Sequence, residues 1–513
     1  MSSDPRARVL DVVERHRSRP FLIDARTSRA VSYGGFDAIA VRFAAELRRR
    51  GVGKGDRVAL VLPNSIEFAA MYFACLYRGA VAVPISLSAA PPEIAFIVSR
   101  AGLRLIAVTG ATGAQLSAAR AADVSRWQID AVDPGEAPNG TMESDVRDDD
   151  VREDDLWSLT FTSGTTGLPK AVAHRSGALL DAAVAFASAV QLDEQTRMAH
   201  LLPMSYMAGF LNTLLCPFMA GASVVLCRPF DNLTALRFWD SLMPHGVDAM
   251  WLTPTMAAAL LRIDRHQQGR RYCRERVRTV CVGTAPLPPD VKREFEAKYG
   301  VVMLESYGLS ELLFITTQRP GDAAPGSVGL PFAGVEVDIR RPDVDGAGQV
   351  WVRTPYLMQG YLNYDTGTTD DLPRDHWFDT GDLGRMQPDG ALAITGRTKD
   401  LIIRAGVNVS PRAVEDALMG HPAIQHAAVI GVPDSLLGER VAAVVVLKNG
   451  ESLEALRPSI ESLCRERLNV ASRPSELIAV DRLPTGPSGK VQKHRLREEM
   501  LARAARSSHA ADH

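Results

Sequence analysis

The sequence predicts an α/β protein with a large N-terminal domain of parallel sheets covered by helices, a small β-rich subdomain, and a small α+β C-terminal domain. Three observations lead to this prediction. The chain has 513 residues, which is too many for a single hydrophobic core. From 56 to 304, short β-branched runs alternate with amphipathic stretches, a pattern typical of parallel sheets covered by helices. After Phe332 the pattern changes to short strands separated by Gly and Asp turns.

In the large domain, the run RVALVL at 57–62 is the first clear buried strand. We expect Asn64 to cap the helix that follows, because Glu67 three residues later completes a capping-box pattern. That helix should end at Gly79. Further strands are expected at 80–85, 223–227, 248–252, 279–283 and 301–305, with helices between them.

The end of the chain has its own alternation of strands and helices. The strand-like DLIIR precedes a helix from Pro411, and ELIAV follows a helix near 452–468. The stretches at 133–155 and 319–327 have the composition of surface loops. We therefore expect an N-terminal core at 1–395, a C-terminal domain at 396–503, and a disordered tail at 504–513 that is too polar to pack.

Composition narrows the range of partners. The 58 basic and 60 acidic residues give a net charge of −2, so the chain has no long-range attraction to nucleic acid or anionic lipid. No apolar run approaches the ~20 residues of a membrane-spanning helix, and the N-terminus lacks an apolar signal region. The six cysteines form no C-x-x-C pair, which favours buried reduced thiols over zinc or disulfides. We expect a cytoplasmic protein, monomeric or homodimeric.

The stretch TSGTTGLPK at 162–170 has the composition of a phosphate-binding loop. Its glycines let backbone N–H groups approach an anion, and its hydroxyls and lysine add donors and charge. It differs from the P-loop of NTPases, because Leu168 and Pro169 separate Gly167 from Lys170 and Ala171 follows the lysine. The strand-like LWSLTFT precedes it, which places the loop at a strand's carboxyl end. The alternative is a Gly/Thr-rich surface turn.

Four further stretches carry groups suited to a nucleotide. In SYGLSE (306–311), Tyr307 could stack on a base and Glu311 could ligate Mg²⁺. In WFDTGDLG, Asp382 could accept both hydroxyls of a ribose. Arg397 in GRTKD could contact ribose or phosphate, and Lys490 lies in a Pro/Gly/Ser loop. Taken singly, each has a structural alternative as a core tyrosine, a turn aspartate, a surface arginine or a solvated lysine.

Together and in this order, these motifs resemble those of the ANL family of adenylate-forming enzymes, which includes acyl-CoA synthetases, peptide-synthetase adenylation domains and luciferases. The resemblance extends from about residue 20 to 497, and GTAP (283–286), DTGD (379–382) and SGK (488–490) contribute to it. It implies that ATP and Mg²⁺ convert a carboxylic acid into an acyl-AMP with release of pyrophosphate. Coenzyme A would then take the acyl group, since 431–447 is similar to free-standing acyl-CoA and aryl-CoA ligases.

The resemblance also implies a set of site residues. The catalytic group would be Lys490, Glu311, Thr166 and Lys170, with Glu311 holding Mg²⁺ through the phosphates. The nucleotide site would add Thr162, Ser163, Gly164, Thr165, Gly167, Gly283, Thr284, Ala285, Pro286, Glu305, Ser306, Tyr307, Gly308, Ser310, Asp382 and Arg397. The acid pocket would comprise Tyr206, Met207, Ala208, Gly209, Asn212, Val282, Gly283, Ser306 and the 312–314 run that begins at Leu312. Lys399 would be the hinge.

About this hinge the C-terminal domain would act as a mobile lid. It would withdraw Lys490 after adenylation and bring in a strand at 404–408, with Gly406 near the pantetheine tunnel. Tyr206 stands where many CoA ligases carry a histidine, so the acceptor stays open between CoA, a carrier-protein phosphopantetheine, an amine and another nitrogen nucleophile. An α-amino acid is disfavoured because no Asp occupies the position that usually binds its amine, and an aryl or medium-length acyl acid fits better. An inactive scaffold conflicts with the retained motif residues, and a phosphotransferase conflicts with the loop spacing.

Overall fold

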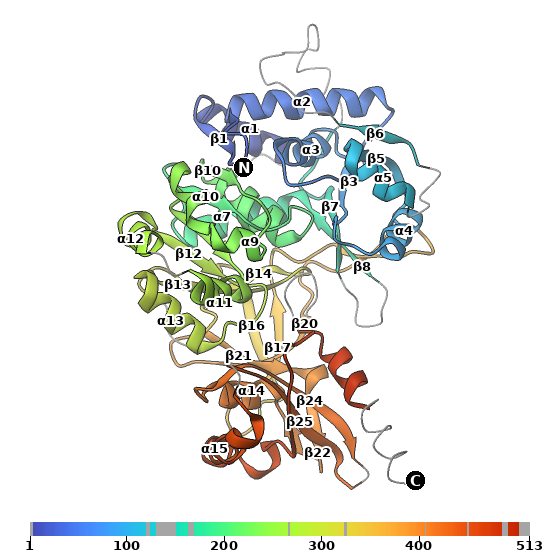
Figure 1. Ribbon diagram of the computed structural model, residues 1–513. Coiled ribbons are helices and arrows are strands. Elements are labelled where there is room, and N and C mark those ends of the chain that lie inside the picture. The colour runs from blue at the N-terminus through green and yellow to red at the C-terminus, as the bar shows by residue number, and fades with distance from the viewer. Residues whose placement is uncertain are drawn as a thin grey trace.

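The computed structural model describes residues 4–118, 124–129, 150–162, 169–264, 267–322, 326–405, 407–434, 436–448, 451–484 and 491–501. These residues form two large sheets with helices around them, a smaller antiparallel sheet, and a separate C-terminal sheet. Figure 1 shows the large domain above and the C-terminal domain, in orange and red, below it. The α/β fold class predicted from the sequence is confirmed.

The first large sheet has nine strands in the order β15-β14-β13-β12-β11-β9-β10-β1-β2. Neighbours from β1 through β13 along this order are parallel, while β2, β14 and β15 are antiparallel. The carboxyl ends of the parallel strands therefore lie along one edge, where α/β sheets bind ligands. The strands are β1 (Pro20–Asp24), β2 (Ala30–Ser32), β9 (Arg197–His200), β10 (Ser223–Leu226), β11 (Ala249–Leu252), β12 (Thr279–Val282), β13 (Met303–Leu309), β14 (Leu313–Thr317) and β15 (Leu330–Pro331).

The second large sheet has eight strands in the order β19-β18-β8-β7-β4-β3-β5-β6. Its parallel part, β7-β4-β3-β5-β6, is extended by antiparallel pairing of β8 with both β7 and β18. The strands are β3 (Arg57–Val61), β4 (Val81–Pro84), β5 (Leu103–Val108), β6 (Arg126–Gln128), β7 (Leu156–Thr162), β8 (Lys170–Arg175), β18 (Gly360–Leu362) and β19 (Thr369–Asp371). TSGTTGLPK thus connects β7 to β8.

Helices fill the space around these sheets. They are α1 (Pro5–Arg15), α2 (Tyr33–Arg49), α3 (Ile66–Tyr77), α4 (Pro91–Arg100), α5 (Gly110–Ala118), α7 (Ser176–Ala189), the π-helix η1 (Ala208–Leu215), α8 (Cys216–Met219), α9 (Asn232–Leu236), α10 (Phe238–Leu242), the 3₁₀ turn η2 (Met243–His245), α11 (Pro254–Ile263), α12 (Gln267–Arg276) and α13 (Pro289–Tyr299). Every residue of α3 is buried, as expected for a helix at the centre of a large domain. The stacked rings of Tyr72 and Phe210, 3.9 Å apart, join α3 to η1.

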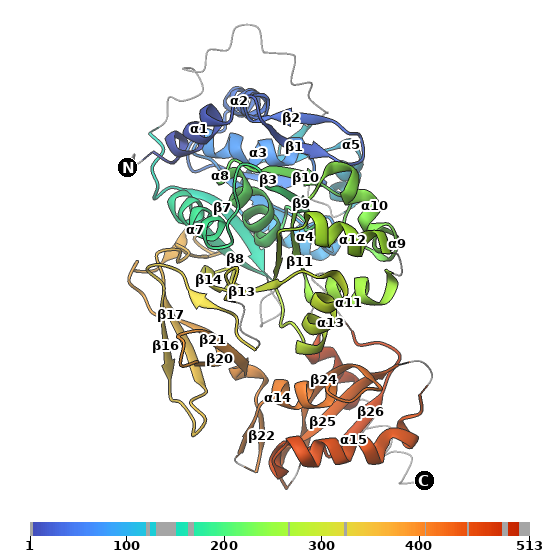
Figure 2. The ribbon, with the colours of Figure 1, turned by 90° about the vertical axis from the view of Figure 1, so that its left-hand side faces the viewer.

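The smaller sheet and the C-terminal domain follow. β16 (Glu336–Arg340), β17 (Gly348–Arg353), β20 (Phe378–Met386) and β21 (Leu392–Arg397) form an antiparallel sheet, and η3 (Thr398–Asp400) follows it. The C-terminal sheet contains β22 (Ile402–Arg404), β23 (Val407–Val409), β24 (Ile424–Asp434), β25 (Gly438–Leu447) and β26 (Glu476–Ala479), with α14 (Pro411–Met419), α15 (Leu453–Arg467) and the turn η4 (Val470–Ser472). It has an apolar cluster on each face. In Figure 2, α14 lies beneath α13 of the large domain.

Two local predictions were wrong. Ser65, not Asn64, caps α3, because the Ser65 hydroxyl accepts the Phe68 N–H at 3.1 Å. The stretch 404–408 is not one strand, because Arg404 ends β22 while Val407 and Asn408 belong to β23, which pairs with β22 in the antiparallel sense. The tail at 504–513 and most of the acidic loop at 133–155 lie outside the described residues.

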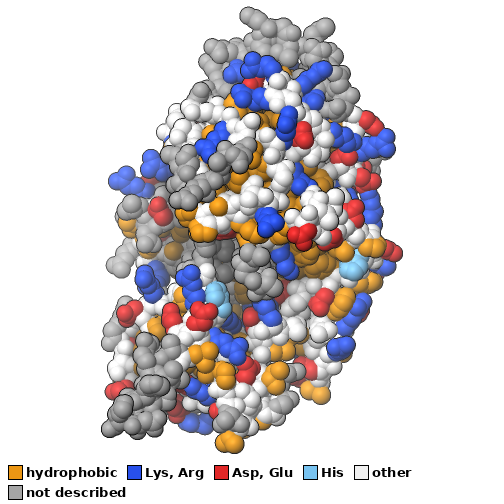
Figure 3. Space-filling model, turned by 90° about the vertical axis from the view of Figure 1, so that its right-hand side faces the viewer, with side chains coloured by type: hydrophobic (Ala, Val, Ile, Leu, Met, Phe, Trp, Pro, Cys, Tyr) orange, Lys and Arg blue, Asp and Glu red, His pale blue; other side chains and the backbone are white. Residues whose placement is uncertain are grey.

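The state of the cysteines and the mixture of surface charges match what the composition predicts. All six cysteines are free and buried, as predicted. On the face shown in Figure 3, Lys and Arg side chains are interspersed with Asp and Glu. None of the described helices has the length and apolar character that crossing a bilayer requires.

One buried histidine makes stability sensitive to acid. His174 of β8 is fully buried, and neither ring nitrogen has a hydrogen-bond partner. Burial lowers the pKa of His174 to about 3. The unfolded chain would take up a proton first, so this residue costs no stability above its unfolded pKa and progressively destabilises the fold as pH falls from about 6.5 toward 3.

We predict that His174→Leu will make the protein less sensitive to acid. Between about pH 7.5 and pH 5, its free energy of unfolding should fall by about 2 kcal/mol less than that of the wild type, because the variant removes a group that protonates only on unfolding. Urea unfolding at both pH values measures this. The exposed His376→Leu is the control, expected to follow the wild type. Equal losses in His174→Leu and the wild type would contradict the prediction.

Candidate active site

A buried carboxylate joins the large domain to the small sheet. Asp382 of β20 has a side chain only 3% exposed, and its Oδ1 forms an ion pair with Arg397, 2.8 Å from the Arg397 Nε. The Tyr307 hydroxyl from β13 donates to its Oδ2 at 2.6 Å. Burial and the neighbouring Asp382 raise the pKa of Tyr307, so this hydroxyl stays protonated as a donor. Three residues predicted for the nucleoside therefore lie together.

The antiparallel ladder of the small sheet fixes this arrangement. Asp382 and Arg397 are paired across β20 and β21, which places their side chains on the same face. The Asp382 N–H also donates to the Thr380 hydroxyl at 3.1 Å. Lys399, the predicted hinge, lies two residues beyond Arg397 in η3. This cluster, the predicted nucleoside corner, thus lies directly beside the connection to the C-terminal domain.

A second cluster lies where the phosphate loop rejoins the sheet. The Lys170 ammonium at the start of β8 lies 5.1 Å from the ring centroid of Tyr361 in β18. The Tyr361 hydroxyl donates to Glu311 Oε1 at 2.8 Å. Burial and the nearby Glu311 raise the pKa of Tyr361, which keeps it a donor. Lys170 and Glu311, predicted to act together, therefore both contact Tyr361.

Parts of the predicted site lie outside the described residues. These are Ser163, Gly164, Thr165, Thr166, Gly167, Gly406 and Lys490. The bases of both loops are described. Thr162 pairs with Lys170 across β7 and β8, and its hydroxyl donates to the Lys170 carbonyl at 3.4 Å. The Gln492 N–H donates to the Pro484 carbonyl at 2.8 Å, which closes the base of the Lys490 loop.

The GTAP turn at 283–286 is strained. Thr284 has φ of +71°, in the left-handed region that β-branched residues rarely adopt. Its buried hydroxyl has no hydrogen-bond partner. Strain and unpaired polar groups of this kind gather at functional sites. The turn, with exposed Pro286 and half-buried Ala285, therefore suits the adenine border predicted for it.

The strand β13 holds the SYG motif by close packing. A Cβ atom on Gly308 would lie 2.0 Å from the Leu313 carbonyl oxygen, so no larger residue fits the β13–β14 hairpin. The Ser306 hydroxyl lies 2.8 Å from that of Thr317. Ser310 follows in the turn between the strands and is half-buried.

Glu305, predicted to bind the nucleotide, has a side chain engaged within the fold. Its Oε1 lies 3.1 Å from the Lys292 ammonium, and this lysine also donates to Gln318 at 2.8 Å. Burial raises the pKa of Glu305 while Lys292 opposes this effect. Its carboxylate therefore links β13, two residues before Tyr307, to Lys292 of α13.

The predicted acid pocket begins in a turn that precedes a π-helix, a distortion common at functional sites. Tyr206 and Ala208 are half-buried, while Met207 and Asn212 are buried. A Cβ atom on Gly209 would lie 1.9 Å from the Pro203 carbonyl oxygen, so glycine is required there. Of the other residues predicted for the pocket, Val282, Leu312, Leu313 and Phe314 are buried and Gly283 lies against Trp251.

The residue that holds the turn at 202–204 was not predicted from the sequence. Asn64, wrongly predicted as a helix cap, donates to the Leu202 carbonyl at 2.8 Å and accepts the Met204 N–H at 2.8 Å. It thereby ties the end of β3 in one sheet to the turn after β9 in the other. Buried His200 was also missed; its Nδ1 lies 2.7 Å from the Thr213 hydroxyl. Burial lowers the pKa of His200 to about 4, so its ring is neutral at pH 7.

The site could hold Mg²⁺ only if substrate phosphates supplied some of the metal's ligands. No cluster of three or more His, Cys, Asp or Glu side chains that could hold a metal occurs in the described part of the chain. Glu311 offers one carboxylate beside Lys170. Mg²⁺ is commonly held by one or two carboxylates together with substrate phosphates and water, and this donor set matches that pattern.

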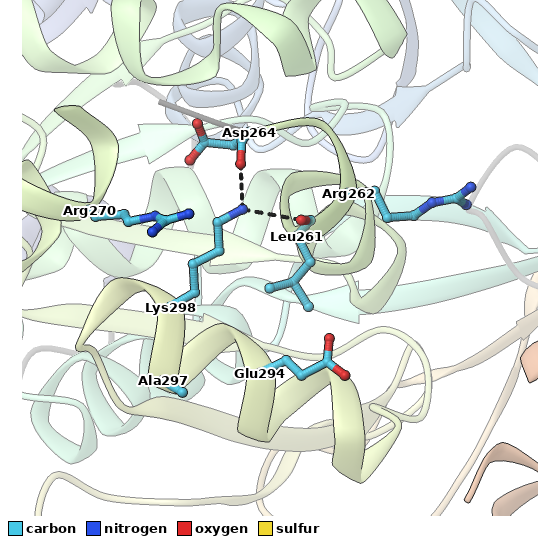
Figure 4. Close-up of a pocket in the computed structure, with 7 residues that line it drawn as sticks. All are labelled: Leu261, Arg262, Asp264, Arg270, Glu294, Ala297 and Lys298. Carbon is cyan, nitrogen blue, oxygen red and sulfur yellow. Dashed lines mark hydrogen bonds between the residues drawn. The ribbon is translucent and has the colours of Figure 1, made fainter. Parts of the chain in front are cut away.

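A pocket of about 500 Å³ lies elsewhere and is lined by residues of α11, α12 and α13 and by Asp264 (Figure 4). Lys298 donates there to the carbonyls of Leu260, Leu261 and Asp264 at 2.6–3.1 Å. This ammonium therefore caps the end of α11. No predicted site residue lines this pocket.

Comparison with known proteins identifies the family. A model of the AMP-binding enzyme family matches residues 9–362, and a model of its C-terminal domain matches 413–490. The chain belongs to the AMP-binding enzyme family. This confirms the resemblance to adenylate-forming enzymes found in the motifs.

Curated relatives and solved structures match along nearly the whole chain. The sulfoacetate–CoA ligase of Cupriavidus necator is 30% identical, covering 93% of this chain and 94% of its own. The feruloyl-CoA synthase of Amycolatopsis is 30% identical, covering 94% and 97%. The structure of ATP-bound MatB from Rhodopseudomonas palustris superposes with a TM-score of 0.85 at 27% identity, covering 97% and 99%. The amide bond synthetase McbA from Marinactinospora thermotolerans gives 0.84 at 27%, also covering 97% and 99%.

We predict that Asp382→Asn will weaken use of ATP. The amide removes the charge that Arg397 and Tyr307 compensate, so kcat/KM for ATP should fall about 10- to 100-fold. Kinetics with varied ATP measure the effect. Asp338→Asn is the control, since Asp338 pairs with Arg340 on the exposed part of the same sheet. A variant with unchanged kcat/KM for ATP would show that Asp382 does not bind the nucleotide.

Proposed function

We propose that this protein is an AMP-forming acid–thiol ligase, which activates a carboxylic acid with ATP and passes the acyl group to coenzyme A. The observation that carries the proposal is the pairing of Asp382 with Tyr307 and Arg397, a buried carboxylate poised for ribose hydroxyls. The Lys170 and Glu311 cluster supplies a charge pattern suited to phosphates and Mg²⁺. Membership in the AMP-binding enzyme family supports the same function.

In the first half-reaction, a carboxylate oxygen attacks the α-phosphorus of ATP. A C–O–P bond forms, the bond between the α-phosphorus and its bridging oxygen breaks, and pyrophosphate leaves. Negative charge accumulates on phosphate oxygens, so fixed cations and N–H donors lower the barrier. The loop at 162–170 would hold the departing phosphates, Glu311 would hold Mg²⁺, and Lys490 would neutralise charge between the carboxylate and the α-phosphate.

In the second half-reaction, the thiol sulfur attacks the acyl carbon. A thioester forms, the bond from the acyl carbon to the AMP oxygen breaks, AMP leaves, and the thiol proton is released to solvent. The β22–β23 hairpin lies at the lower end of the C-terminal domain in Figures 1 and 2. Its apolar Ile403 and Val407 are about half exposed, 56% and 47%. Rotation about Lys399 would bury them against the large domain as Lys490 withdraws.

The acceptor has a second candidate. Tyr206 is a weaker base near neutral pH than the histidine it replaces. An amide bond synthetase is among the similar structures, at 27% identity. An amine acceptor would release AMP from the same acyl-AMP and needs no thiol. The acid itself is open as well, because the curated relatives include sulfoacetate, feruloyl and fatty-acid ligases.

We predict acid-dependent exchange of labelled pyrophosphate into ATP without CoA. The assay uses aryl, short, medium and long acids, because adenylation is reversible before a nucleophile enters. Adding CoA to the active acid should then release AMP and yield a thioester. ADP as product would refute the adenylation mechanism. AMP release that requires an amine and ignores CoA would favour the amide-forming alternative.

We predict that Lys490→Ala will separate the two half-reactions. Exchange should fall more than about 100-fold, because the variant loses a cation at the α-phosphate. Thioester formation from pre-made acyl-AMP should stay within about threefold, since Lys490 would have withdrawn. Lys448→Ala, at an exposed position of the same domain, is the control for general damage. Equal losses in both half-reactions would argue against domain rotation.

A further inference from the structure

One buried donor next to the acid pocket has no partner. Trp251, in β11, is 2% exposed, and its indole Nε1–H makes no hydrogen bond. Burying an N–H without an acceptor destabilises a fold, so such groups are rare in native proteins and call for an explanation. A ligand that supplies the acceptor is one such explanation.

The environment of Trp251 places this donor at the pocket wall. A Cβ atom on Gly283 would lie 2.8 Å from Trp251 Cζ2 and 3.0 Å from the Ser306 carbonyl oxygen. Gly283 and Ser306 both belong to the predicted acid pocket. Cε2, the ring atom bonded to Nε1, lies 3.6 Å from the same point, so the side of the indole that carries Nε1 is close to Gly283.

Two phenylalanines lie near the Trp251 ring. The Trp251 ring lies 5.4 Å from Phe186 and 6.4 Å from Phe314, and these two phenylalanines stack at 4.3 Å. The nucleoside corner at Asp382 and the phosphate corner at Lys170 are built from other strands. Trp251, in β11, belongs to neither of these corners. We therefore place it beside the part of the acid that is distant from the carboxylate.

The other fully or nearly buried tryptophans show what is unusual here. Trp157 donates to the Tyr72 carbonyl at 2.8 Å, and Trp239 donates to Asp264 at 3.0 Å. Trp351 also has an unpaired Nε1, but it is half-buried beneath the Arg340 guanidinium in the small sheet. Among the described residues, Trp251 alone combines near-complete burial, an unpaired N–H and a place beside the predicted pocket.

We propose that Trp251 selects acids that carry an uncharged oxygen acceptor, an ether, keto or hydroxyl oxygen, on the part distant from the activated carboxylate. This inference rests on the proposed function. An indole N–H can only donate, so its partner must be an acceptor. Phe186, Phe314 and Gly283, which lie near the ring, are uncharged, and a buried anion without a cation is strongly disfavoured. An uncharged oxygen is therefore the best match.

The test compares matched pairs of acids by pyrophosphate exchange. The pairs are benzoate with 3- and 4-methoxybenzoate, and hexanoate with 5-oxohexanoate. A site built to hydrogen-bond its substrate discriminates against the analogue that lacks the group. The wild type should favour at least one acceptor-bearing acid by about tenfold in kcat/KM over its plain partner. Trp251→Phe keeps an aromatic ring but removes the donor, so this preference should disappear.

Trp157→Phe is the matched control. It removes an indole N–H that donates to the Tyr72 carbonyl, so it should lower the Tm. It should leave the preference for acceptor-bearing acids intact. Trp251→Phe removes an unpaired donor and should lower the Tm less.

Three outcomes would overturn the inference. The wild type could use both members of every pair equally, which needs no variant to observe. Trp251→Phe could still catalyse exchange and keep the wild-type preference. That result would contradict the role of Trp251 but not the proposed function. Exchange could be absent with every acid, including the broader panel, which would remove the proposed function and this inference together.

Discussion

The Asp382 carboxylate is the interaction on which the arrangement of the site depends. It is nearly removed from water, so its charge needs compensation, and that compensation comes from Arg397 and Tyr307. The Tyr307 contact reaches across from the nine-stranded sheet, while the Arg397 contact stays within the small sheet beside the hinge. One buried charge therefore fixes the positions of the large sheet, the small sheet and the connection to the C-terminal domain relative to one another. Loss of Arg397 would leave this charge without a counter-ion, and loss of Tyr307 would remove the donor to its Oδ2.

The site departs from the well-satisfied packing of the surrounding core. Thr284 has left-handed backbone and an unpaired hydroxyl, and Trp251 has an unpaired N–H on the other side of Gly283. Each feature destabilises the unliganded fold, and a bound substrate can supply the missing partners. The deep core compensates for them, because α3 and the facing strands are almost completely buried. Stability is thus concentrated away from the surface where chemistry would occur.

The sequence predicted the strands well because their buried, β-branched runs are local signals. It predicted the grouping of Tyr307, Asp382 and Arg397 through motif order. It failed where two local readings compete or where the partner is distant in sequence. Asn64 and Ser65 are both good helix caps, and only the position of the 202–204 turn decides that Ser65 caps α3 while Asn64 binds the turn. Tyr361 and Trp251 were missed because their roles arise from strand pairing across the sheet, which no local pattern encodes.

The attachment of Asn64 has a consequence for how this pocket can diversify. Asn64 holds the backbone of Leu202 and Met204, not their side chains. These two hydrogen bonds do not depend on the side chains of Tyr206 and Ala208, which are half-buried in the predicted pocket. Substitutions at these two positions would therefore leave the anchor of the segment in place. Because the anchor binds only backbone atoms, it can be kept while the side chains that determine specificity change.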